Sequence, residues 1–147
     1  TGTAEARSFV QARSNYATMT SPADRRYTKT HEWVALDGDV ATIGVTDFAQ
    51  SELGDITYLD LPDIGTAISE NSAFGVVESV KAANDIFSPI DGEVVERNDA
   101  AVDAPETVNS SPYGDAWLVK VRISDPAKYD ALMDAAAYDS FAESAAH

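Results

Sequence analysis

The feature that most constrains the fold is a succession of short apolar runs, separated by turn residues, between positions 27 and 123. Asp37, Gly38 and Asp39 separate two of these runs, and Gly between polar residues is typical of a hairpin turn because it tolerates positive φ. No run approaches the ~18 residues that a membrane-spanning helix needs. The pattern predicts a small β sandwich or barrel with strands at 32–36, 40–45, 57–61, 74–80, 85–90, 93–97 and 117–123.

Two helices are expected beside these strands. A short helix is expected over 47–53, with Asp47 and Gln50 spaced like a capping box and Gly54 placed to end it. A second helix is expected over 126–143, with Asp125 as N-cap and Pro126 in the first turn, where its missing N–H costs nothing. Its apolar residues recur at helical spacing and predict one face that packs on the sheet, formed by Tyr129, Leu132, Met133, Ala136 and Ala137.

Charge and composition exclude several functions. The 10 Lys and Arg stand against 25 Asp and Glu, and a formal net charge of −15 repels the phosphates of nucleic acids. Because the chain has no Cys, thiolate catalysis and Cys-ligated metals are excluded. His31 precedes Glu32, but the other imidazole is at His147 and no acids cluster at ligand spacing, so we predict no metal site. Any redox or group-transfer chemistry must therefore come from a cofactor, and neither a nucleic acid nor a membrane is an expected partner.

The first 26 residues differ in composition from the rest. They hold four Arg against two acids, together with several Ser and Thr, which is typical of organelle transit peptides. The alternative is upstream or vector-derived sequence ahead of a start at Met19. We therefore predict a leader-like extension at 1–26 and one folded domain at 27–147, a length that suits a single core.

Lys81 is the sharpest feature of the acidic stretch. It is the one Lys or Arg between Lys29 and Arg97, an interval that holds fourteen acids. Small residues follow it at Ala82 and Ala83, which predicts an open hairpin tip where the amine is accessible to a modifying enzyme. The alternative is a solvated turn lysine that balances nearby acids.

The surroundings of Lys81 carry a resemblance to a known family. The run Glu78-Ser79-Val80-Lys81-Ala82, between Phe74-Gly75 and Ser88-Pro89-Ile90-Asp91-Gly92, resembles the lipoylation hairpin of the glycine cleavage system H-protein family. Roughly residues 27–143 are covered. Ala116 stands where the family usually has Gly, and Glu70-Asn71 where Lys-Gly is common. Further matches are His31-Glu32-Trp33, Ile43-Gly44-Val45-Thr46-Asp47, Ala49-Gln50, Leu53-Gly54-Asp55, Leu61-Pro62, Val108-Asn109, Pro112-Tyr113-Gly114, Trp117-Leu118 and Leu132-Met133.

This resemblance implies a mainly β fold, namely a lipoyl/biotinyl-type half-barrel β sandwich with a short internal helix and a C-terminal α-helix. It implies a carrier without catalytic residues of its own, with lipoate in amide linkage on Lys81. The arm then takes the aminomethyl intermediate from a pyridoxal-phosphate-dependent glycine decarboxylase to a tetrahydrofolate-dependent aminomethyltransferase, and the dithiol to dihydrolipoyl dehydrogenase. Lipoate-attaching enzymes are further partners, and a monomer is expected, in the mitochondrial matrix, or in the cytoplasm if the source is bacterial.

The resemblance also implies that Glu32 and Asp85 line the cleft where the amine-loaded arm docks. With fourteen acids in the interval, ordinary surface acids are the alternative for this pair. Two other functions share the fold or the lysine. A biotinyl carrier normally has Met on both sides of the lysine, where this chain has Val80 and Ala82. A lipoyl-relay protein, which passes its lipoyl group to other dehydrogenase complexes, is compatible with the same Lys81.

Overall fold

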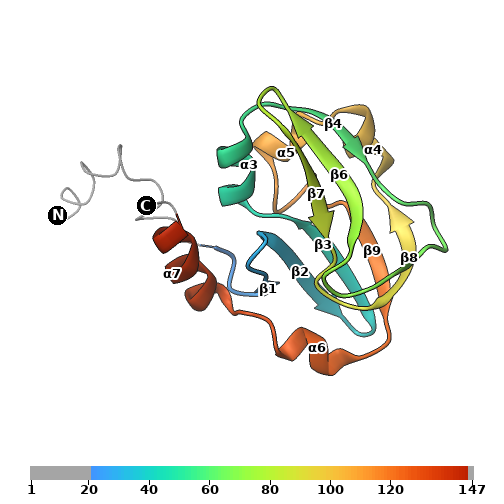
Figure 1. The fold of residues 1–147 in the computed structure, drawn as a ribbon. Coiled ribbons are helices and arrows are strands. Elements are labelled where there is room, and N and C mark those ends of the chain that lie inside the picture. The colour runs from blue at the N-terminus through green and yellow to red at the C-terminus, as the bar shows by residue number, and fades with distance from the viewer. Residues whose placement is uncertain (1–20, 146–147) are drawn as a thin grey trace.

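The computed structural model describes residues 21–145, which form two antiparallel sheets with helices at their edges (Figure 1). One sheet has the strand order β1-β2-β3-β9-β8-β5, and the other has the order β4-β6-β7. This architecture confirms the predicted mainly β sandwich with an internal and a C-terminal helix. The strands are β1 (Arg26–Tyr27), β2 (Glu32–Asp37), β3 (Val40–Val45), β4 (Ile56–Asp60), β5 (Ala67–Ile68), β6 (Ala73–Ser79), β7 (Ala83–Phe87), β8 (Gly92–Arg97) and β9 (Val119–Ile123).

Local turn chemistry sets the strand pairing. β2 and β3 pair from Glu32 opposite Val45 to Asp37 opposite Val40, and the turn between them places Gly38 at φ 65°. The hairpin predicted at this Gly is therefore confirmed. Apolar side chains from both sheets fill the core, as alternation along half-buried strands requires. The fully buried members include Ile43, Leu59, Ile86, Ile90, Val94, Leu118, Val119 and Val121.

The short internal helix α3 (Asp47–Leu53) forms where it was predicted. The capping box expected from Asp47 and Gln50 is wrong, because the N-cap is Thr46, whose Oγ1 accepts a hydrogen bond from the backbone N–H of Ala49 at 3.1 Å. Gly54 ends the helix at φ 81°, and its N–H donates to the carbonyl of Gln50. Two further short helices, α4 (Asp99–Asp103) and α5 (Thr107–Ser110), were not predicted.

The single helix predicted over 126–143 is wrong, because the chain breaks it in two. α6 (Pro126–Asp130) begins at the predicted N-cap Asp125, and α7 (Ala135–Ala145) follows after a gap. Between them Met133 forms an isolated bridge with Tyr27, in which each backbone N–H donates to the other's carbonyl. An extended residue held in this way cannot continue a helix.

The predicted packing face of this helix is also wrong in part. Ala136 and Ala137 are exposed, whereas Tyr138 and Ala142 of α7 are buried. Tyr138 stacks on Tyr27 of β1 at 4.8 Å between ring centroids, so α7 packs beside the N-terminal strand (Figure 1). α6 lies at another edge of the sandwich.

The residues that lead into β1 contact the domain. Ser21 donates from its backbone N–H and its hydroxyl to the carboxylate of Asp139 on α7. The guanidinium of Arg25 lies 4.5 Å from the ring centroid of Trp33. The leader predicted at 1–26 falls mostly on residues 1–20, which lie outside the described residues, and it stays a prediction. Within residues 21–145, no helix has the length and apolar character needed to cross a membrane.

Candidate functional site

Lys81 lies at the tip of the hairpin formed by β6 and β7. The strands pair up to Glu78 opposite Ala83, and the Ser79 N–H donates to the carbonyl of Ala82 at 2.8 Å. The Ser79 hydroxyl oxygen accepts from the backbone N–H groups of Lys81 and Ala82. The lysine side chain is exposed. The side chain of Ser79 thus closes the turn, and the amine of Lys81 stays exposed outside it.

The amine of Lys81 rests against the end of α3. Its Nζ donates to the backbone carbonyl of Glu52 at 3.2 Å. A helix C-terminus carries partial negative charge, which favours a cation at this position. Gly54 lies beside the lysine, and its φ of 81° is in the left-handed region that favours glycine at this helix end.

A cleft of about 530 Å³ begins at this helix end. It lies between α3, the loop before β2 and the strand β7, and Glu32 and Asp85 both line it. Lys81 is not a lining residue, but its amine contacts Glu52, which is one. Glu32 and Asp85 therefore share one cleft, and the amine of Lys81 contacts the backbone of a residue at its edge. Apolar walls are contributed by Val45, Phe48, Ala49, Leu53, Val77 and Ile86.

Glu32 is the buried acid of the cleft, with 2% of its surface exposed. Its Oε1 accepts hydrogen bonds from the hydroxyls of Thr28, at 2.7 Å, and Thr30, and its Oε2 accepts from the N–H of Phe87 at 3.2 Å. Burial raises the pKa of Glu32 to about 7, although hydrogen bonds from Thr30, Thr28 and Phe87 act in the opposite direction. All three donors are neutral, so the carboxylate is solvated by dipoles rather than by a charge.

Asp85 differs from Glu32 in its setting. It lies on β7 opposite Val76, and its side chain is exposed. Glu52, at the end of α3, is a second exposed acid of the lining, so the cleft has one buried and two exposed acidic residues beside apolar walls. This combination suits a ligand with a cationic end and an apolar stem, because the stem is sheltered while the charge meets acids.

Sequence reasoning missed several residues that build the site. Thr28 and Thr30 precede Glu32 at alternate positions, and that spacing could have indicated two hydroxyls directed at one carboxylate. Asn109 connects the end of α3 to the start of β4, close to Lys81. Its Oδ1 accepts from the N–H of Ile56, and its Nδ2 donates to the carbonyl of Gly54, both at 2.9 Å. Asn109 belonged to the resemblance, but no local signal gave it this role.

Known proteins are similar to this chain in sequence and in fold. The family model described as "Glycine cleavage H-protein" matches residues 25–145. A glycine cleavage system H protein from Phenylobacterium zucineum is 57% identical over 116 residues, which cover 79% of this chain and 96% of the relative. One from Anaeromyxobacter sp. strain K is 50% identical over 125 residues, which cover 85% and 98%.

A solved structure agrees with these relatives. The crystal structure of a glycine cleavage system H protein from Mycobacterium marinum matches with a TM-score of 0.76 and 34% identity, and the match covers 86% of this chain and all of that one. Sequence and fold therefore point to the same family, as the hairpin around Lys81 predicted. The chain belongs to the glycine cleavage H-protein family, the lipoyl carriers of the glycine cleavage system.

Proposed function

We propose that Lys81 is the residue of this carrier that bears lipoate. The observation that carries the proposal is the exposed amine at the turn between β6 and β7, in contact with the residue Glu52 of the cleft. An attaching enzyme can reach a side chain at such a tip from several directions. The amide N–H that replaces the ammonium keeps a donor for the Glu52 carbonyl, so the root of the arm stays beside the cleft.

The bound lipoyl group supplies a dithiolane that accepts the one-carbon unit and is reduced in the same step. This chain's own residues hold and shelter the aminomethyl cargo. Glu32 and Asp85 present carboxylates to its nitrogen and favour the ammonium form over the free amine. That protonation matters because the free amine's lone pair can expel the thiolate and give an iminium that water destroys. The apolar walls limit the access of water.

The chain works with the other proteins of the system. We propose a tether that visits the glycine decarboxylase, the aminomethyltransferase and dihydrolipoyl dehydrogenase in turn, after a lipoate-attaching enzyme has modified Lys81. The net charge of −15 favours fast encounters with basic partner surfaces. We propose a monomer without catalytic residues, which acts in the mitochondrial matrix of a eukaryotic source or in the cytoplasm of a bacterial one.

Mass spectrometry tests the attachment site. Protein made in its own organism is measured intact, and its peptides are mapped. We expect one lipoyl amide on Lys81 and none in Lys81→Arg, which keeps the charge but removes the acylatable amine. A lipoyl group on Lys29, Lys120 or Lys128 would overturn the assignment.

Ammonia release tests the cleft. The lipoylated protein is loaded by the decarboxylase, separated from it, and followed without folate or partner enzyme. We expect Glu32→Gln and Asp85→Asn to release ammonia faster than the wild type, while lipoylation of Lys81 stays intact. Glu93→Gln is the matched control, because Glu93 is exposed on β8 and does not line the cleft. Equal rates in all four proteins would reject the role of these acids and leave the carrier function in place.

A further inference from the structure

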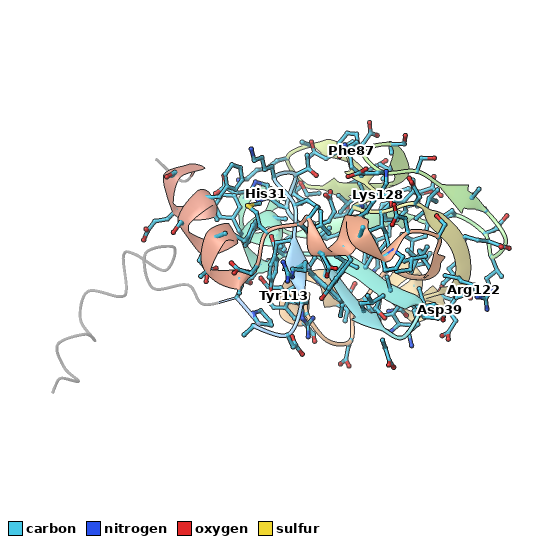
Figure 2. All side chains as sticks on the ribbon, turned by 90° about the horizontal axis from the view of Figure 1, so that it is seen from below. His31, Asp39, Phe87, Tyr113, Arg122 and Lys128 are labelled. Atoms are coloured by element: carbon cyan, nitrogen blue, oxygen red, sulfur yellow. The ribbon has the colours of Figure 1, made fainter. Side chains whose placement is uncertain are left out.

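His31 connects the cleft to the C-terminal helix. It lines the cleft beside Glu32, and Figure 2 shows it next to α7. Its Nδ1 lies 2.8 Å from the hydroxyl of Tyr138, which lies 2.7 Å from Oγ1 of Thr46. Its ring also packs against Phe48, at 4.6 Å between centroids. One wall of the cleft is thus held by a residue that comes more than 100 positions later in the chain.

The backbone of His31 supports the same conclusion. Its φ of 71° lies in the left-handed region, which is uncommon for a residue with a side chain and costs energy. Two backbone hydrogen bonds hold it there: the His31 N–H donates to the Thr28 carbonyl, and the Thr46 N–H donates to the His31 carbonyl, both at 3.1 Å. The ring position is therefore fixed from the backbone as well as from Tyr138.

The hydrogen-bond partners connect the protonation of His31 to Tyr138. Thr46 Oγ1 accepts from the N–H of Ala49 and has a hydrogen of its own, for which the Tyr138 oxygen is an acceptor. In that arrangement the hydroxyl of Tyr138 donates to Nδ1 of His31, and the neutral ring carries its hydrogen on Nε2. An imidazole with a hydrogen on Nδ1 donates instead, so the Tyr138 hydroxyl turns toward Thr46, whose oxygen can accept a second hydrogen bond. The first arrangement keeps an acceptor within the network for both hydroxyl hydrogens, and it is the one adopted in the proposal below.

A neutral ring suits a cleft that receives a cation. The other charged groups that line the cleft are Lys29, Glu32, Glu52 and Asp85, and Tyr138 faces His31 from α7. Burial lowers the pKa of His31, and Glu52 opposes this effect. An imidazolium at this position would repel an ammonium in the same cleft.

We propose that Tyr138 is a positioning residue for the loaded arm, because its hydroxyl holds His31 as an uncharged wall of the cleft. The inference rests on the docking of the cationic cargo proposed above, and it extends the site to α7. It predicts that a single hydroxyl on the C-terminal helix affects both the protonation of His31 and the lifetime of the cargo.

Nitrogen-15 NMR of the imidazoles tests the first part on unmodified protein. The chain has two His, so His147→Gln assigns the signals. We expect the neutral form of His31 to carry no hydrogen on Nδ1 in the wild type. In Tyr138→Phe, which keeps the ring stacked on Tyr27, we expect the titration midpoint of His31 to rise toward that of an ordinary histidine. A wild-type His31 with hydrogen on Nδ1, or an unchanged midpoint in the variant, would overturn the proposal.

Ammonia release from the loaded protein near pH 7 tests the second part. We expect Tyr138→Phe to speed release, with the ratio of variant to wild-type rates growing as pH falls from 7 toward 6, where more of the His31 ring becomes charged in the variant. Tyr129→Phe is the control, because it removes a tyrosine hydroxyl on α6 from a residue that does not line the cleft. Thermal unfolding of each variant separates a local effect from loss of the fold.

Comparison with Glu32→Gln separates the two proposals. Faster release in Glu32→Gln with an unchanged rate in Tyr138→Phe would overturn the role of Tyr138 alone. Unchanged release in both variants would overturn docking in the cleft, and the role of Tyr138 with it. Faster release in Tyr138→Phe with a shifted His31 midpoint supports the inference, since a merely structural contribution would not move the titration of one ring.

Discussion

The buried carboxylate of Glu32 makes folding stability depend on pH in a defined direction. The pKa of Glu32 is about 7 in the folded protein, against 4.5 for an unperturbed glutamate. Between these values the folded chain holds a proton that the unfolded chain has lost, so stability falls as pH rises. This acid therefore opposes folding once it is charged, unlike a carboxyl that is paired with a cation.

The size of the effect follows from the two pKa values. The full difference corresponds to about 3 kcal/mol. About 2 kcal/mol of it is lost between pH 5.5 and pH 8. Glu32→Gln removes the titration but keeps an oxygen that can accept from Thr28 and Thr30. Its amide hydrogens then face the N–H of Phe87, which adds a cost that does not change with pH.

Denaturant unfolding of both proteins from pH 5.5 to pH 8 checks this prediction. The other acids titrate alike in the two chains, so the difference between the two free energies of unfolding isolates Glu32. We expect the wild type to lose about 2 kcal/mol relative to Glu32→Gln over this range. Two curves that stay parallel would show that Glu32 is charged at no extra cost, and the reasoning from burial would be refuted.

Three further outcomes are expected. Association with the partner enzymes, followed by stopped flow, should slow as salt rises, because the Debye length falls from about 10 Å at 0.1 M to about 3 Å at 1 M; a salt-independent rate would contradict charge steering. Gly75→Ala should lower stability by about 1–3 kcal/mol in denaturant unfolding, since its Cβ would lie 2.6 Å from the carbonyl oxygen of Asp60. Asn109→Ala should lose about 2 kcal/mol, because the N–H of Ile56 loses its acceptor; unchanged denaturation midpoints would refute both estimates.

The strand pattern could be predicted from sequence because turn residues and apolar alternation act locally. Gly38 and Gly54 each mark a change of chain direction that the structure confirms. The break between α6 and α7 could not be predicted in this way. Its cause is the backbone bridge of Met133 to Tyr27, which joins residues 106 positions apart. Helical spacing continues across this point in the sequence, and a tertiary contact overrides it.

The candidate site also has parts that the sequence could predict and parts that it could not. Lys81 could be found from its isolation among acids and from the hairpin around it, both of which are local features. The neighbours of Glu32 could be suspected from the spacing of Thr28 and Thr30. The link from His31 to Tyr138 could not, because only the packing of α7 beside β1 brings these two side chains together.

If the loaded arm docks in the cleft as proposed, the cost of burying the charge of Glu32 also affects how tightly the cation is held there. Domains have about 5–15 kcal/mol of stability, so a charge that costs about 3 kcal/mol is a large part of it. Within residues 21–145 the hydrogen-bond donors to this carboxylate are neutral, and no ion pair joins it to Lys29 on the same cleft. A cation docked beside Glu32 removes part of that cost, so its binding energy includes relief of a penalty already present in the empty protein. When the cation leaves, the carboxyl can take up a proton near neutral pH and recover the same relief. Under the proposed docking, proton and cargo compete for one carboxylate, and this competition would keep the affinity for the cargo moderate, as a carrier that must release its load requires.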